Sequence, residues 1–321
     1  MSEAGLFARI RAASAEVARR ARQVRIDDGA LDAFAAHLAA ERPRPPAIDP
    51  AHQVLRNPAT TLAYVVTLNA VNFGSGWFPH VTKRPGLSGY LTFATALREQ
   101  FEARGPWRAD ELCKLGADDC ARVFCQRLET PVDELMELFA RALRDLGEYL
   151  LAEHRGRFAG PVEQARGSAE RLVGLLAEMP LYRDVARYQD LEVPFYKRAQ
   201  ITCAGLAEAL GGRGLGRFED LAELTLFADN LVPHVLRMLG ILVYDLRLEA
   251  RIDREELLSS GSEEEVEIRA VALTAVERLA ASCAQRGFAI TPQRLDALLW
   301  SRGQSARMKA RPRHRTRCTF Y

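Results

Sequence analysis

A lysine and an aspartate between residues 193 and 240 have the side chains and the surroundings for bond cleavage. Lys197 directly follows Tyr196 at the start of a predicted helix. Asp229 ends an apolar run that includes Phe227 and precedes another predicted helix. A carboxylate in apolar surroundings can stabilise a developing positive charge or deprotonate an attacking water. Asp229 also has a second interpretation, because an aspartate before a helix caps its first amides.

A long loop gathers aromatic and amide side chains that could hold a ligand. Residues 72–89 interrupt the helical pattern and contain Asn72, Phe73 and Trp77. Long loops in compact helical proteins are often functional. The alternative is a loop whose aromatic side chains simply pack on the core.

Composition and charge exclude several classes of protein. The 321 residues are 48% hydrophobic and 27% charged, which is typical of a globular chain. The net charge of +2 lacks the basic field of most nucleic-acid-binding proteins. No apolar run reaches the roughly 18 residues of a membrane span. The N-terminal segment carries charges where a signal peptide needs an apolar stretch, so we expect a cytoplasmic protein.

The cysteines do not have the spacing of a metal site. In a cytoplasmic chain they are expected to be reduced thiols. Cys113, Cys120 and Cys125 are separated by six and four residues, and no fourth ligand follows them. Zinc and iron–sulfur sites need a tighter and complete set. We therefore expect no metal ligands here.

Apolar residues recur at the three- and four-residue spacing of helices along almost the whole chain. The sequence predicts a single all-α domain over residues 1–321, with residues 131–151 as its clearest helix. A short strand is predicted at 286–290. The other predicted helices cover residues 4–22, 28–41, 59–71, 87–103, 117–128, 168–178, 196–210, 218–225, 230–241, 263–284 and 291–301.

One predicted helix opens on a run of glutamates. Ser262 is its expected N-cap, and the glutamates that follow suit the positive end of the helix dipole. Arg269 lies four residues after Glu265, and we expect the two to pair on the surface. The segment 302–317 contains seven basic residues and no acidic one. It either binds a phosphate group or is only solvated.

The order of these elements resembles the catalytic core of helix-hairpin-helix DNA glycosylases. In that family an aspartate at a helix start stabilises a cationic sugar, and some members add a lysine that forms a Schiff base. Asp229 and Lys197 stand at the corresponding places. However, residues 192–196 replace the Gly-x-Gly hairpin that grips DNA, and the basic footprint of duplex binding is missing. A DNA or RNA base glycosylase is therefore kept as an alternative function.

A second resemblance runs from about residue 52 to the C-terminus and has five motifs in order. The motifs are LYRDV (181–185), FYKRAQI (195–201), LFAD (226–229), EEVEIRA (264–270) and HRTRCTFY (314–321). They are similar to those of the queuosine salvage protein family. The resemblance implies hydrolysis of queuosine 5'-phosphate to queuine and ribose 5-phosphate, with water as the nucleophile and no metal or organic cofactor. A non-catalytic queuine-binding protein is the further alternative.

The same resemblance implies that the partner is a small nucleotide, with no stable nucleic-acid complex and no membrane. It also implies that Asp229 and Lys197 are the catalytic residues. Asp229 would stabilise the oxocarbenium-like sugar and deprotonate water. Lys197 has three open roles: it pairs with Asp229, binds the 5'-phosphate or attacks C1' as an amine. The oligomeric state is left open.

Queuine is a 7-deazaguanine, so protonation at N7 is not available to help the base leave. We therefore expect a tight set of polar contacts to the base. Each candidate has an alternative role in packing or helix capping. The candidates are His52, Asn69 and Asn72 for the base edge, Phe73 and Trp77 for stacking, Tyr196 for the sugar, Phe227 and Trp300 for the pocket wall, and His234, Arg237, His314 and Arg315 for the phosphate.

Overall fold

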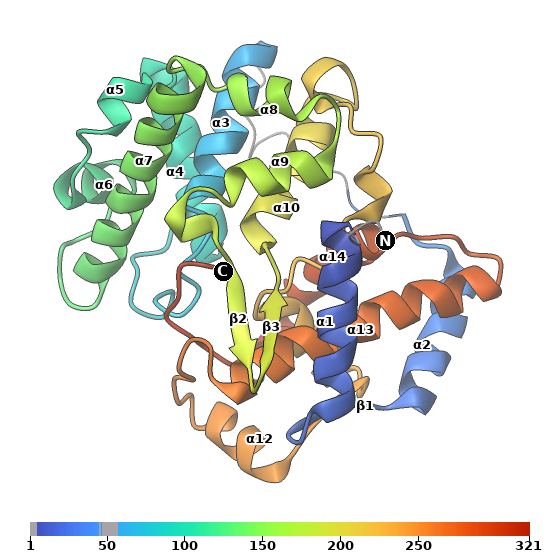
Figure 1. The fold of residues 1–321 in the computed structure, drawn as a ribbon. Helices are drawn as coiled ribbons and strands as arrows, with labels where there is room; N and C mark the ends of the chain where they lie inside the picture. The colour runs from blue at the N-terminus through green and yellow to red at the C-terminus, as the bar shows by residue number, and fades with distance from the viewer. Residues whose placement is uncertain (1–4, 45, 47–56) are drawn as a thin grey trace. The chain divides into compact units, whose positions relative to one another are not determined.

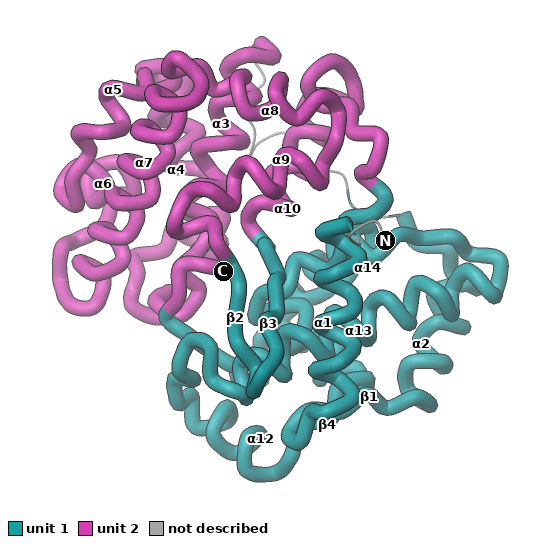
Figure 2. The backbone as a smooth tube through the Cα atoms, viewed as in Figure 1, with its two compact units in different colours: residues 1–47, 184–197, 222–317 teal, residues 48–183, 198–221, 318–321 magenta. Residues whose placement is uncertain are grey.

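The computed structural model describes residues 5–44, 46 and 57–321, and the predicted helical class is confirmed: the chain is predominantly helical with two small antiparallel sheets (Figure 1). His52 lies outside the described residues. The chain divides into two compact units, coloured teal and magenta in Figure 2. Unit 1 comprises residues 1–47, 184–197 and 222–317, and unit 2 comprises residues 48–183, 198–221 and 318–321. The single-domain interpretation stays a prediction.

Unit 1 is built around one long helix, α13 (Glu263–Gln285). The other helices of unit 1 are α1 (Leu6–Arg20), α2 (Asp28–Glu41), α11 (Leu231–Met238), α12 (Leu246–Asp253), α14 (Pro292–Gly303) and α15 (Ala306–Lys309). Helix α13 contacts α1, α2, α11, α14 and three of the strands. It begins at the predicted cap, because the Ser262 hydroxyl accepts the amide of Glu265. The helix is therefore the centre of the core of unit 1.

The strands of unit 1 form two separate antiparallel pairs. Strand β1 (Val24–Ile26) pairs with β4 (Leu242–Tyr244), and β2 (Val185–Tyr188) pairs with β3 (Leu191–Pro194). The predicted strand at 286–290 is wrong, because those residues form a turn and an irregular segment after α13. Three- and four-residue strands are too short to show an alternating pattern, so periodicity could not reveal the strands that form.

Charged residues on α13 are buried within unit 1. Glu267 is fully buried and accepts hydrogen bonds from the amides of residues 22–24. Arg269 is 1% exposed and forms an ion pair with Asp184 at 2.7 Å. The predicted surface pair of Arg269 with Glu265 is therefore wrong in its location: the two side chains lie 3.5 Å apart but both are buried. Neighbouring elements cover the face that the i,i+4 pattern assigned to solvent.

Unit 2 packs around α7 (Val132–His154), the helix that the sequence predicted most clearly. Phe139 on α7 makes edge-to-face contacts with Phe73, Phe93 and Phe124 at centroid distances of 5.1 to 5.3 Å. The other helices are α3 (Pro58–Ala70), α4 (Gly89–Arg104), α5 (Ala109–Leu112), α6 (Ala117–Val123), α8 (Gly160–Ala165), α9 (Ala169–Leu176) and α10 (Lys197–Ala209), whose first residue belongs to unit 1.

The predicted helix at 218–225 is wrong, since only a single 3₁₀ turn forms at Leu221–Glu223. The carboxylate of Asp220 instead accepts the amides of Ala169 and Glu170 and the hydroxyl of Ser168. These bonds cap the start of α9 and hold residue 220 in a turn. In the part of the chain that the structure describes, no helix is both long and apolar enough to cross a membrane.

Candidate active site

Lys197 is placed by the base of the β2–β3 hairpin. The carbonyl of Asp184 accepts the amides of Phe195 and Tyr196 at 2.9 and 3.2 Å. The Asp184 carboxylate accepts the amide of Lys197 at 3.1 Å. Tyr196 has φ +49°, which is strained for a bulky residue and persists only with support from its surroundings. Three hydrogen bonds to one residue give this support, and Lys197 opens α10 with 6% of its surface exposed.

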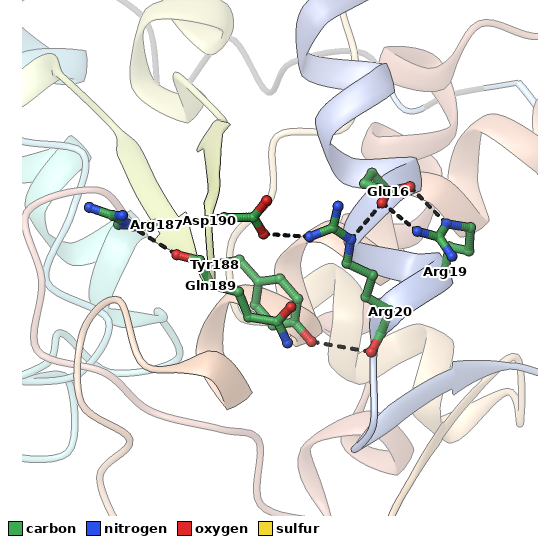
Figure 3. A network of polar contacts seen from close by, with 7 residues as sticks. All are labelled: Glu16, Arg19, Arg20, Arg187, Tyr188, Gln189 and Asp190. Atoms are coloured by element: carbon green, nitrogen blue, oxygen red, sulfur yellow. Dashed lines mark hydrogen bonds and ion pairs between the residues drawn. The ribbon is translucent and has the colours of Figure 1, made fainter.

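The far end of the hairpin is fixed to α1 (Figure 3). Arg20 donates from Nη1 to Asp190 Oδ1 at 2.6 Å and from Nε to Glu16 at 2.5 Å. The Tyr188 hydroxyl lies 3.4 Å from the carbonyl oxygen of Arg20 and donates to the Glu267 carboxylate at 2.8 Å. The exposed ion pairs contribute little on their own. The buried hydroxyl–carboxylate bond is the stronger restraint on the hairpin.

Asp229 lies in the turn before α11. Its Oδ1 accepts the amides of Leu231 and Val232 at 2.8 and 3.0 Å, so the predicted capping is present. Both capping bonds use the same carboxylate oxygen, and the residue is only half-buried. Capping therefore leaves the other carboxylate oxygen, Oδ2, outside these two bonds.

Asp296 on α14 is a second acid beside Asp229. It is 7% exposed, and its Oδ1 accepts the amide of Phe227 at 3.3 Å. Burial raises the pKa of Asp296 well above its usual range, the negative charge of Asp229 raises it further, and Lys197 opposes the change. A carboxyl group with a raised pKa holds its proton and can donate it. The two aspartates are therefore suited to different steps of one reaction.

Arg313 brings a second positive charge to the same place. Burial lowers the pKa of Arg313, and the negative charge of Asp229 opposes that change. The neighbouring backbone is anchored, because the Asn230 side chain donates to the carbonyl of His314 at 3.2 Å. Electrostatic interactions of Asp229 with Asp296 and Arg313, and of Asp296 with Lys197, thus connect two carboxyl groups and two cations within unit 1.

The two arginines expected at the phosphate are engaged in structural contacts. Arg237 is 8% exposed and donates to Glu249 at 3.0 Å and to Asp253 at 2.9 Å. Arg315 donates to the carbonyl of Glu255 at 2.7 Å. Their phosphate role stays a prediction, and these contacts lead us to prefer Arg313.

The two histidines expected at the phosphate are buried and neutral. His234 Nε2 lies 2.8 Å from the carbonyl oxygen of Met308, and burial lowers its pKa. Burial and nearby arginines lower the pKa of His314 to about 3. A neutral imidazole offers a phosphate at most a hydrogen bond. The phosphate role of both histidines stays a prediction.

We expect His314 to make the protein sensitive to acid. The folded pKa lies below the ordinary value of 6.5, so the unfolded chain binds more protons between pH 6.5 and about 3, and stability falls as the pH falls through that window. The loss reaches on the order of 5 kcal/mol once the pH has fallen to the folded pKa. The free energy of unfolding of His314→Gln should therefore depend less on pH than that of the wild type. Urea titrations at pH 5 and pH 7 measure the free energy of unfolding of both proteins. An equal change in that free energy between the two pH values, in wild type and variant, would contradict this.

The amide residues predicted to contact the base lie in unit 2 near Arg198. Asn69 is buried, and its Oδ1 accepts the Asn72 side chain at 3.0 Å. The Arg198 guanidinium donates to the carbonyl of Ala70 at 2.5 Å and lies over the Phe73 ring at 4.9 Å. The structure therefore brings Asn69, Asn72 and Phe73 together around one buried arginine. Contact of these side chains with a base stays a prediction.

Phe73 and Trp77 are part of the core of unit 2. Phe73 is 3% exposed, and Trp77 is 1% exposed with its indole Nε1 donating to Glu134 at 2.9 Å. Both rings therefore pack in the core, as the alternative interpretation of this loop expected. A stacking role for either ring stays a prediction.

Three further predicted residues belong to unit 1 together with the acids. Phe227 is 6% exposed and bonded through its amide to Asp296. Trp300 is half-buried and lies one turn after Asp296 on the same face of α14. Tyr196 is half-buried in the strained turn before Lys197.

Sequence reasoning missed Asp296, Arg313 and the Asp184–Arg269 pair. A signal existed for Asp296, since it is an acid inside the apolar run Leu295–Leu299. Arg313 stood in the basic segment but was not singled out. No spacing pattern could join Asp184 to Arg269, because they are 85 residues apart.

The cysteines are free thiols with no metal arrangement around them. Cys113 is half-buried, Cys120 is buried and Cys125 is exposed. Burial raises the pKa of Cys120 to about 12, which makes its thiol inert. Within the described ranges, no three His, Cys, Asp or Glu side chains are grouped to hold a metal ion.

A proton-holding acid beside a carboxylate is the arrangement of an acid–base hydrolase.

A family model described as queuosine salvage protein matches residues 51–321. A protein of Sphaerobacter thermophilus named queuosine 5'-phosphate N-glycosylase/hydrolase is 38% identical over 95% of both chains. Proteins of the same name from Bos taurus and Mus musculus are 33% and 37% identical, over 73% and 58% of this chain and 72% and 58% of their own. This chain belongs to the queuosine salvage protein family.

Proposed function

We propose that this chain hydrolyses the N-glycosidic bond of queuosine 5'-phosphate, releasing queuine and ribose 5-phosphate for queuine salvage into tRNA. The names of the relatives supply the substrate. The observation that carries the chemistry is the pairing of a half-buried carboxylate, Asp229, with a buried acid of raised pKa, Asp296. Fold similarity alone would not license a substrate.

Asp229 acts at the sugar. As the bond between C1' and the base nitrogen breaks, its electron pair goes to the base and positive charge develops on the ribose. A carboxylate beside C1' stabilises that charge, and it then takes a proton from the water that attacks C1'. Phe227 and Leu231 on either side are buried, and apolar surroundings strengthen the electrostatic interaction.

Asp296 acts at the leaving base. Because carbon replaces N7 in queuine, the base needs proton donation or hydrogen bonding at another position of its edge. A carboxyl group that holds its proton supplies such a donor, and the amide of Phe227 fixes its orientation. Trp300, on the same face of α14, is placed in this proposal at the wall of the base pocket.

Lys197 and Arg313 supply the positive charges of the site. Arg313 suits the 5'-phosphate, because a guanidinium binds phosphate oxygens in pairs. Lys197 contributes a positive charge that acts on Asp296. Tyr196 at the sugar, and Asn69, Asn72, Phe73 and Trp77 at the base, remain part of the proposal on the strength of the family resemblance.

We expect Lys197 to act without forming a covalent bond to the sugar. Hydrolysis by water needs no amine, so reduction with borohydride during turnover should leave no stable protein adduct. Lys197→Met should still lower kcat by about 100-fold, because a positive charge that acts on Asp296 is lost. An adduct that forms on the wild type and disappears in the variant would establish amine attack instead.

The proposal extends to architecture and partners. A lysine opening α10 and an aspartate before α11 support a relation to the helix-hairpin-helix glycosylases. A small nucleotide as partner, without a stable nucleic-acid complex or a membrane, and a cytoplasmic location also stay predictions. Duplex DNA should bind weakly if at all, and salt-sensitive binding would favour the nucleic-acid glycosylase instead.

The direct test is to incubate the purified chain with queuosine 5'-phosphate and to separate the products by chromatography. Free queuine and ribose 5-phosphate in equal amounts are expected. Binding of the nucleotide without release of the base would mean a queuine-binding protein. The unphosphorylated nucleoside, run in parallel, measures what the phosphate contributes.

A further inference from the structure

We propose that Arg269 is a positioning residue that holds the segments carrying Lys197 and Asp229 in fixed register, the first through Asp184 and the second through the carbonyl of Ala228. The inference rests on the proposed function for its catalytic consequence, although the structural link can be tested without it. Arg269 lies on α13 and is 1% exposed.

The first link runs from Arg269 to Lys197. The guanidinium donates to both carboxylate oxygens of Asp184, at 3.0 Å to Oδ1 and 2.7 Å to Oδ2. The same Oδ2 accepts the amide of Lys197, and the Asp184 carbonyl accepts the amides of Phe195 and Tyr196. Arg269 therefore fixes the residue that supports the strained turn before α10.

The second link runs from Arg269 to Asp229. Its Nε donates to the carbonyl of Ala228 at 3.0 Å. Ala228 immediately precedes Asp229, so this bond sets the direction from which the chain enters the capping turn of α11. One planar side chain thus bonds both segments that present catalytic groups.

The environment of Arg269 favours arginine specifically. Its guanidinium carbon lies 3.9 Å from the centroid of the Phe195 ring, a stacking geometry that a planar guanidinium satisfies. Its donors point in fixed directions to Asp184 and Ala228, and Glu265 lies 3.5 Å away as a second buried carboxylate. Lysine keeps the charge but cannot make the paired bond and the Nε bond together.

A buried residue on the same helix provides a matched control. Glu267 is fully buried and accepts hydrogen bonds from the amides of residues 22–24 and from the Tyr188 hydroxyl. These hydrogen bonds do not involve Asp184 or Ala228. Glu267→Gln therefore changes a side chain that is as buried as Arg269, at a different place in the core of unit 1.

The experiment compares Arg269→Lys, Asp184→Asn and their combination with Glu267→Gln. We expect each of the first two changes to lower kcat by about 10- to 100-fold with KM within about threefold, since misplacing catalytic groups by an ångström has effects of that size. The combination should be no worse than the more severe single change, because both break one link. Glu267→Gln should lower Tm, and it should lower kcat less than either of the first two changes does.

Hydrogen exchange of the backbone amides, read by mass spectrometry, tests the link itself. Exchange in 195–197 and 228–232 should accelerate together in Arg269→Lys, and exchange in 195–197 should accelerate in Asp184→Asn. In Glu267→Gln the response should be confined to 22–24 and the hairpin around Tyr188. Unchanged exchange in the first two segments, or wild-type kcat in folded Arg269→Lys and Asp184→Asn, overturns the inference. If the wild type itself releases no base, the proposed function fails, and exchange alone then decides the link.

Discussion

Asp229→Asn is expected to reduce turnover of queuosine 5'-phosphate by about 10³-fold or more. Losing a base and losing electrostatic stabilisation of the transition state each remove roughly 10²–10³-fold, and one carboxylate supplies both here. The amide oxygen of asparagine can still accept the amides of Leu231 and Val232 that Asp229 caps now. Tm should therefore stay close to that of the wild type.

Asp229→Ala separates capping from chemistry. Loss of the capping bonds should cost about 1 kcal/mol of stability on top of the lost turnover. The measurements are kcat from queuine release and Tm from calorimetry on the same samples. Wild-type kcat in Asp229→Asn would show that capping is the only role of this residue.

Asp296→Asn is expected to lower kcat by about 10²-fold and to stabilise the protein near neutral pH. The activity falls because an amide cannot transfer a proton to the leaving base. The stability rises because the folded pKa of Asp296 lies above its ordinary value of 3.8. The folded state therefore binds more protons than the unfolded chain, so the wild type loses stability as the pH rises from 3.8 through the folded pKa.

The pH dependence makes this second prediction specific. The wild type should lose up to about 1.4 kcal/mol per pH unit at this residue within that window, and the asparagine variant should not. The kcat/KM of the wild type should also fall as the pH rises through the Asp296 pKa. An Asp296→Asn protein that is less stable than the wild type at pH 8, or fully active, would show that Asp296 is not a protonated acid that serves the reaction.

The parts of the fold that local pattern determines were predictable. Leu135, Phe139 and Leu146 recur on one face of α7, and that helix forms as expected. Ser262 caps α13 for the same local reason. By contrast, the many polar residues of α13 look like a solvated face, and their burial depends on partners such as Asp184 that are distant in the sequence.

The same distinction applies to the candidate site. FYKRAQI and LFAD located Lys197 and Asp229, and the structure places both beside Asp296 in unit 1. The pKa of Asp296 depends on burial and on a charge 67 residues away in the sequence, which no local pattern encodes. Where the structure shows ring packing, as for Trp77, the residue type alone could not separate a core residue from a ligand contact.

The most direct test of the central claim is a crystal structure of the Asp229→Asn protein with intact queuosine 5'-phosphate. We expect the side-chain oxygen of residue 229 at about 3–3.5 Å from C1' of the ribose, the distance of a near-attack arrangement. The base should lie against Asp296. A side chain turned away from the sugar, or a ribose bound at a different site, would contradict the account.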